Sequence, residues 1–178
     1  MTLVSEYNPA WPSWFQQIRA LVAEKLGSYC LTIEHVGSTA VPGMTAKPII
    51  DLDVVIESDQ FEKVRILLSE LGYYHQGDLG IPEREAFALE NAEMVQALPP
   101  HHLYLCPRAS AELTRHLAFR NFLRARPDWV SRLSELKRSL SELHGNDREA
   151  YMEGKSAMVQ EITCSALQDS EKRHQQSE

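Results

Sequence analysis

Apolar side chains recur at helical spacing near the start of the chain and throughout its last third. Residues 9–26 carry one such stripe, which ends at Gly27, and glycine commonly follows the last turn of a helix. Three further stripes follow Ser110 and are separated by Pro127 and Gly145. The pattern therefore predicts one N-terminal helix and three C-terminal helices.

Apolar runs with a different pattern predict β-strands between these helices. Residues 29–36 alternate apolar and polar positions, and residues 48–56 form a β-branched apolar run that contains two aspartates. Asp59, followed three positions later by a carboxylate, predicts a capped helix that ends at Gly72. The shorter, interrupted patterns of residues 73–106 predict two or three further strands.

Helices and strands are thus mixed over the first two-thirds of the chain, and the last third is helical. This arrangement is typical of the α+β class. We expect an α/β core over residues 1–108, C-terminal helices packed on it over residues 109–167, and a disordered polar tail over residues 168–178. A chain of 178 residues has room for one compact domain of this kind.

The charge and hydropathy of the chain limit the kinds of partner that the protein could bind. The net charge of −7 argues against binding to long nucleic acid, although residues 108–138 carry eight basic side chains against three acidic ones and could bind a small polyanion. No apolar run approaches the roughly 20 residues that span a bilayer, and the first residues lack the features of a secretory signal. We expect a cytoplasmic protein with no membrane partner, whose oligomeric state the composition does not specify.

Asp51 and Asp53 are the most informative polar residues of the chain. Side chains two apart on a strand share a face, about 7 Å apart at the backbone. Neighbouring carboxylates repel each other and lose hydration, which is costly unless a cation lies between them. The alternative is a solvated strand face, but aspartate is disfavoured in apolar strands. The pair therefore predicts a site for Mg²⁺ or Mn²⁺.

A turn rich in small residues follows the strand predicted at residues 29–36. Its start, Gly37-Ser38-Thr39, could present backbone N–H groups and a hydroxyl to a phosphate. Gly-Ser is also an ordinary turn sequence, and the chain contains no Walker loop. Glu34 and His35 end the preceding strand, where they could orient this turn or face a pocket.

Gly37-Ser38 followed by Asp51-Leu52-Asp53 resembles the signature of the nucleotidyltransferase superfamily related to DNA polymerase β. Longer strings narrow the resemblance to the GrpB family and span about residues 6–166. The matching strings are Tyr7-x-Pro9-x-Trp11, residues 34–43, 47–51, 102–104 and 119–124, and Tyr151-x-x-x-Lys155. The resemblance implies a nucleotidyltransferase-like fold, in which a short mixed β-sheet is flanked by helices and followed by a helical C-terminal part.

The resemblance also implies a chemistry. Asp51 and Asp53 would hold Mg²⁺ and catalyse transfer of a nucleoside monophosphate from a nucleoside triphosphate to an acceptor, which is an unknown small molecule or protein. Ser38, with Gly37 and Thr39, would contact the phosphates. Positioning and charge neutralisation would supply much of the catalysis.

One departure from the superfamily pattern concerns a third carboxylate, which is usually found on a later strand. Residues 101–106 are the best candidate for that strand, and they carry no acid. His102 is the candidate replacement, as a ligand or a base, since its unperturbed pKa lies near neutrality. A histidine that simply bonds to its neighbours is the alternative, and Glu85 and Glu90 are fallback acids.

Several basic residues could bind the triphosphate. Arg120 and Arg124 share one helix face and could clamp an anion, and Lys47 and Lys155 are further candidates. The alternative is a solvated basic face whose stems pack on the core. Arg84 lies in a loop that could close over the site.

These features favour a nucleotidyltransferase over two other functions. A non-catalytic nucleotide-binding or regulatory module would keep the fold and lose the chemistry, as the missing third acid suggests. A metal-dependent phosphohydrolase would use the same aspartates with water as the acceptor. The base preference and the acceptor do not follow from the sequence.

Overall fold

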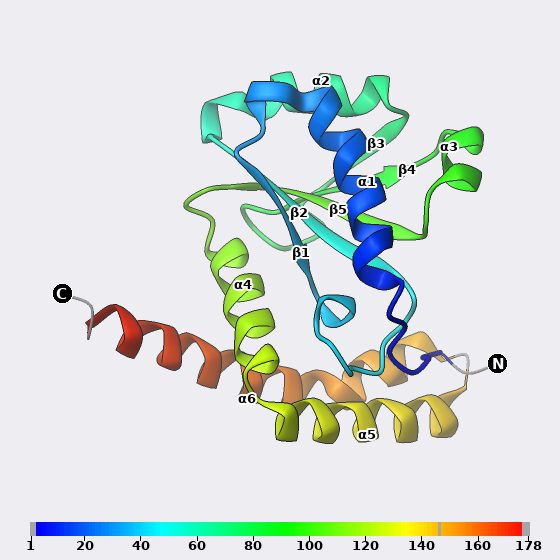
Figure 1. Cartoon of the computed structure of the whole chain (residues 1–178), viewed down its shortest axis with the longest axis vertical. Coiled ribbons are helices and arrows are strands. Elements are labelled where there is room, and N and C mark those ends of the chain that lie inside the picture. Colours follow the sequence, from blue (N-terminus) through cyan, green and yellow to red (C-terminus); the bar gives the residue numbers. More distant parts are fainter. Residues whose placement is uncertain (1–2, 146, 176–178) are drawn as a thin grey trace. The chain divides into compact units, whose positions relative to one another are not determined.

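The computed structural model describes residues 3–145 and 147–175 (Figure 1). They form two compact units. The sheet unit consists of Ala10–Val36 and Ile49–Thr114, and the helical unit consists of the described residues within Met1–Pro9, Gly37–Pro48 and Arg115–Glu178. No helix in the described part of the chain has the length and apolar character of a membrane span.

The sheet unit is built on five strands in the order β1-β2-β5-β4-β3. These are β1 (Thr32–Val36), β2 (Ile50–Ile56), β3 (Tyr73–Gly77), β4 (Glu85–Leu89) and β5 (His101–Pro107). β2 and β5 run parallel, and the other neighbouring strands are antiparallel. The sheet is therefore short and mixed, and the predicted α+β class is confirmed.

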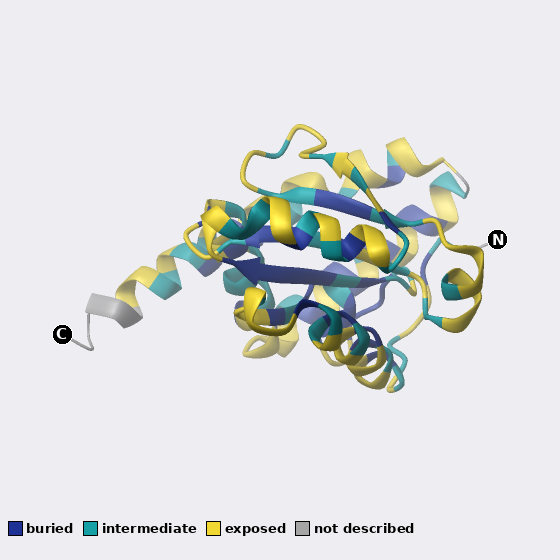
Figure 2. Cartoon of the chain, turned by 90° about the horizontal axis from the view of Figure 1, so that it is seen from above, coloured by how far each residue is buried: buried dark blue, intermediate teal, exposed yellow. Residues whose placement is uncertain are grey.

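One face of this sheet packs against helix α1 (Trp11–Leu26). The ring of Phe15 on α1 stacks on His35 of β1, with centroids 4.7 Å apart, and His35 pairs in register with Leu52 of β2. Side chains alternate along a strand, so Asp51 and Asp53 point to the opposite face. Burial follows this layering, with dark blue strands and yellow outer helix faces in Figure 2.

The remaining short helices of the sheet unit differ from the sequence expectation. Helix α2 (Phe61–Glu70) follows a 3-10 turn (Ser58–Gln60), and its N-cap is Gln60 without a side-chain bond, so the predicted Asp59 cap is wrong. Helix α3 (Ala92–Ala97) was not expected, and Asn91 caps it by accepting a bond from the Met94 N–H at 3.0 Å.

The helical unit contains most of α4 (Ala111–Arg124), α5 (Pro127–His144) and α6 (Arg148–Gln175). α5 and α6 lie side by side (Figure 1). Val41 and Met44, from the turn that follows β1, are buried with α5 and α6 residues such as Leu133 and Ile162, so apolar packing holds this turn within the unit. Residues 168–175, expected as a disordered tail, are helical, and residues 176–178 of that tail lie outside the described residues.

Candidate functional site

The two aspartates lie in different environments on the same face of β2. Asp53 is fully buried, at 0% exposure, whereas the Asp51 side chain is 29% exposed. Cross-strand register pairs Asp51 with His102 and Asp53 with Tyr104 on β5. A buried carboxylate is costly unless it is hydrogen-bonded or balanced by a positive charge, so this face of the sheet suits a cation.

His102 is bonded to the first of these aspartates. Its Nδ1 lies 3.0 Å from Oδ1 of Asp51, and its side chain is 45% exposed. An ionised carboxylate can only accept a hydrogen bond, so Nδ1 donates and a neutral ring leaves Nε2 as an acceptor. Asp51 therefore orients a histidine whose second nitrogen can take a proton or a metal.

A further acid, Glu34, lies on this face and could not be given a role from the sequence. Glu34 on β1 pairs in register with Asp53, and its Oε1 accepts a bond from the Thr32 hydroxyl at 3.2 Å. Among the described residues, no three His, Cys, Asp or Glu side chains are arranged to hold a metal ion. The fallback acid Glu85 is bonded to His75 at 2.7 Å. A metal on this face would therefore take few protein ligands.

In the helical unit, the phosphate-loop candidate begins with a glycine in an unusual conformation. Gly37 has φ 69° and ψ −167°, a region that only glycine adopts readily. Ser38 and Thr39 form a 3-10 turn with Ala40 directly after it. Thr39 is buried, whereas Ser38 is only partly buried. Ser38 is thus the side chain of this turn most able to meet a ligand.

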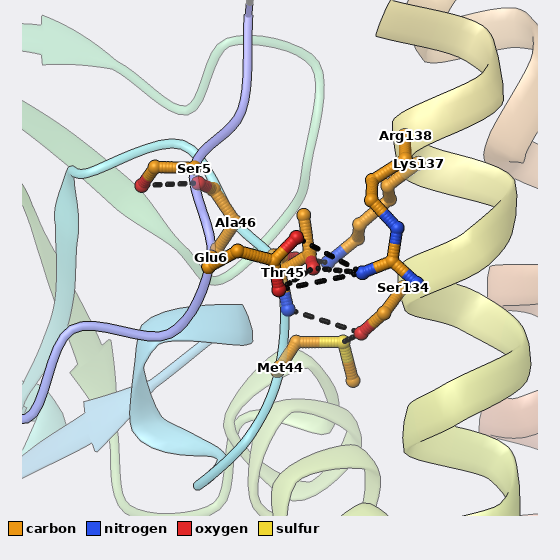
Figure 3. A network of polar contacts seen from close by, with 8 residues as sticks. All are labelled: Ser5, Glu6, Met44, Thr45, Ala46, Ser134, Lys137 and Arg138. Atoms are coloured by element: carbon orange, nitrogen blue, oxygen red, sulfur yellow. Dashed lines mark hydrogen bonds and ion pairs between the residues drawn. The ribbon is translucent and has the colours of Figure 1, made fainter.

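Lys137 on α5, whose role the sequence did not reveal, makes a polar contact with this turn. It is only 2% exposed, and its Nζ donates to Ser38 Oγ at 2.7 Å and to the Thr45 carbonyl at 3.0 Å. Ser134 accepts the Thr45 N–H at 3.0 Å, and Arg138 donates to Thr45 Oγ1 at 2.9 Å. Figure 3 shows these α5 side chains converging on Thr45. A buried ammonium group therefore supports the Ser38 hydroxyl.

Two of the predicted cations meet at one aromatic ring. Nζ of Lys47 lies 4.9 Å from the ring centroid of Tyr151, and Nζ of Lys155 lies 5.4 Å from it. Burial and then the charge of Arg148 lower the pKa of Lys47, while burial raises the pKa of Tyr151 to about 12. Several positive charges are thus held close together here, which suits an anionic ligand.

Arg120 and Arg124 make different contacts among the described residues. Nε of Arg124 donates to the Ala40 carbonyl at 2.9 Å and so braces the end of the Ser38 turn. Nε of Arg120 donates to its neighbour Asn121 at 3.0 Å. The structure thus assigns Arg124 a contact with the turn, and the anion clamp expected of the pair stays a prediction.

The short mixed sheet with its flanking helices has a nucleotidyltransferase-like fold. The Cid1 poly(U) polymerase in its MgGTP-bound crystal structure aligns with a TM-score of 0.51 at 10% identity, covering 79% of this chain and 44% of that one. At this identity the likeness concerns the fold alone.

The chain belongs to the GrpB family, whose model matches residues 2–165, so the predicted family is confirmed. The crystal structure of the conserved protein GrpB from Enterococcus faecalis aligns with a TM-score of 0.82 at 32% identity, covering 94% of this chain and 98% of that one. A UPF0157 protein of Pseudomonas aeruginosa is 36% identical over 168 residues, which is 90% of this chain and 65% of the relative. The chain therefore spans slightly less than two-thirds of that relative.

Proposed function

We propose that the protein is a Mg²⁺-dependent nucleotidyltransferase that transfers a nucleoside monophosphate from a triphosphate to a small-molecule or protein acceptor. The observation that carries the proposal is the carboxylate pair of β2, Asp51 and fully buried Asp53, on one sheet face of a nucleotidyltransferase-type fold. A carboxylate buried beside a second one is costly, and a bound cation would offset that cost.

The donor set fits Mg²⁺ better than a metal that needs a complete protein cage. Mg²⁺ is usually bound through one or two carboxylates together with substrate phosphates and water, and Asp51 and Asp53 supply two carboxylates. Mn²⁺, which also prefers oxygen ligands, is the natural substitute. When bound, the metal would neutralise charge on the transferring phosphoryl group.

Ser38 and Lys137 would act on the phosphates. Lys137 donates to the Ser38 oxygen, so the hydroxyl proton of Ser38 is directed to another acceptor, and a phosphate oxygen is a strong one. The buried ammonium adds positive charge behind this donor. Lys47 and Lys155, which share the Tyr151 ring, would add further positive charge for the triphosphate.

His102 would act as a general base on the acceptor. Asp51 holds its Nδ1, and the free Nε2 can accept the proton that an acceptor hydroxyl loses as it attacks the α-phosphate. The oxygen–phosphorus bond to pyrophosphate breaks as the new one forms, and pyrophosphate leaves. His102→Gln should then lower the rate of transfer more than the affinity for nucleotide.

Calorimetry would test the proposal. ATP, GTP, CTP and UTP are titrated with and without Mg²⁺ into wild type, Asp53→Asn and Glu57→Gln. Glu57 is a matched control, because it is a carboxylate just after β2 that is half exposed and paired with Arg108. We expect Mg²⁺-dependent binding that Asp53→Asn abolishes and Glu57→Gln preserves. A folded wild type that binds no triphosphate would overturn the proposal.

The absence of a three-carboxylate group among the described residues supports a second candidate, a nucleotide-binding module without catalysis. Its product pattern separates it from the transferase. The transferase releases pyrophosphate and modifies an acceptor, a phosphohydrolase releases phosphate, and the binding module does neither.

A further inference from the structure

Arg84 lies on the same face of the sheet as the aspartates. It immediately precedes β4, and its guanidinium carbon lies 4.3 Å from the ring centroid of Tyr104. Tyr104 is the register partner of Asp53 on the adjacent parallel strand, and partners in register share a face. The guanidinium therefore lies over the carboxylate-bearing face, within the sheet unit.

The Nε–H group of this guanidinium has no acceptor among the described residues. Nε of Arg84 is buried and makes no hydrogen bond to any described residue, and a buried donor left in this state destabilises the fold. Other arginines, such as Arg65, Arg108 and Arg126, are paired with carboxylates. The Nε edge of an arginine can bind a carboxylate or a phosphate through two parallel bonds, so an oxyanion would satisfy this donor.

The segment before Arg84 is held in a strained conformation. Leu79 and Glu83 have φ values of 50° and 60°, and left-handed geometry is unfavourable for a residue with a side chain. The Glu83 carboxylate accepts the N–H of Ala111 at 3.3 Å, which anchors the segment to the start of α4. Strain of this kind is found preferentially at ligand sites.

A structural role is the competing explanation. Burial and then the charge of Asp53 raise the pKa of Cys106, whereas the charge of Arg84 opposes this rise. The charges of Arg84 and Asp53 thus both act on the buried Cys106 thiol, and the only role of Arg84 could be to neutralise the negative charge of Asp53. That role requires the charge but not the Nε edge, so a lysine would fulfil it.

We propose that Arg84, stacked on Tyr104, binds an oxyanion, and that the acceptor substrate carries this group as a phosphate or a carboxylate. That the bound molecule is the acceptor rests on the proposed function, whereas the oxyanion site itself does not. The acceptor class then narrows to hydroxyl compounds that also carry an acidic group.

The test observes the Nε–H group directly. Inorganic phosphate and acetate are titrated separately into ¹⁵N-labelled wild type, without Mg²⁺ or nucleotide, and the arginine Nε–H signals are followed by NMR. Arg84→Lys identifies the Arg84 signal by its loss, and Arg108→Lys identifies the signal of an exposed arginine as a control. The Arg84 signal should move with saturation, and the more effective anion shows which acidic group the site prefers.

A second measurement uses the variants. Phosphate or acetate should bind Arg84→Lys at least tenfold more weakly than wild type, and Arg108→Lys should bind as wild type does. An Arg84 signal that neither anion moves, or equal affinity in Arg84→Lys, would overturn the proposal. Because no nucleotide is present, this result is independent of whether Asp53→Asn abolishes nucleotide binding.

Discussion

Replacing Lys137 by methionine tests the support of the Ser38 hydroxyl. The change keeps the length of the side chain and removes the ammonium that donates to Ser38 Oγ and the Thr45 carbonyl. A hydrogen bond from a charged group contributes about 1.5–3 kcal/mol. If the bond to Ser38 acts wholly on the bound triphosphate, its loss weakens nucleotide binding roughly 10- to 150-fold.

The same substitution affects stability in two opposing ways. A Thr45 carbonyl left without its donor costs about 1–3 kcal/mol, while removal of a charge that lost its hydration on folding is favourable. We therefore expect the free energy of unfolding to fall by no more than about 3 kcal/mol. Chemical denaturation followed by circular dichroism measures this change and shows whether the variant is folded during the binding assay.

Arg138→Met is the matched control, because Arg138 follows Lys137 in α5 and contacts Thr45 Oγ1 and Glu6 but not Ser38. Its ion pair with Glu6 is exposed, and such pairs contribute about 0–1 kcal/mol. Calorimetry with the triphosphate that wild type binds best should show a loss for Lys137→Met alone. Equal binding by folded Lys137→Met and wild type, or equal losses in both variants, would refute the reasoning.

Three further predictions concern the backbone and acid stability. Gly37→Ala should cost about 1–3 kcal/mol of stability, because the conformation of Gly37 suits only glycine; denaturant unfolding measures it. Gly72→Ala should destabilise by more than about 1–2 kcal/mol, since φ is +85° and the new Cβ would lie 2.5 Å from Asn91 Cβ; an unchanged melting temperature contradicts this. The pKa of His101 is lowered from 6.5, mainly by burial. The hydrogen bond to the Pro99 carbonyl opposes this shift, and the charge of His102 adds to it. The fold thus favours neutral His101, which accepts a hydrogen bond from the Tyr73 hydroxyl. The contribution of His101 to stability is therefore fully present above pH 6.5 and is lost as the pH falls through the pKa of the folded state. His101→Gln should flatten this decline, which is measured as melting temperature against pH.

The carboxylate strand was predictable because its signals are local. An apolar β-branched run predicts a buried strand, and alternation alone places Asp51 and Asp53 on one face of it. The C-terminal helices were predictable for the same reason, since Pro127 and Gly145 separate stripes of clear helical spacing. The nucleotide chemistry itself rests on the resemblance and stays a proposal.

Lys137 was missed because nothing local distinguishes it. It stands in α5 among leucines at helical spacing, where a lysine ordinarily reaches solvent, and its partners Ser38 and Thr45 lie 99 and 92 positions away in the chain. Arg84 was named only as a loop residue, since its contact with Tyr104 depends on the order of the strands. Tertiary structure alone decides which cations are buried.

The most direct test of the central claim is a crystal structure grown with Mn²⁺ and a non-hydrolysable nucleoside triphosphate. Anomalous scattering locates the metal without assumptions about its ligands. We predict a peak in direct contact with carboxylate oxygens of Asp51 and Asp53 and with the triphosphate. A triphosphate bound elsewhere, or a metal that contacts neither aspartate, would contradict the account.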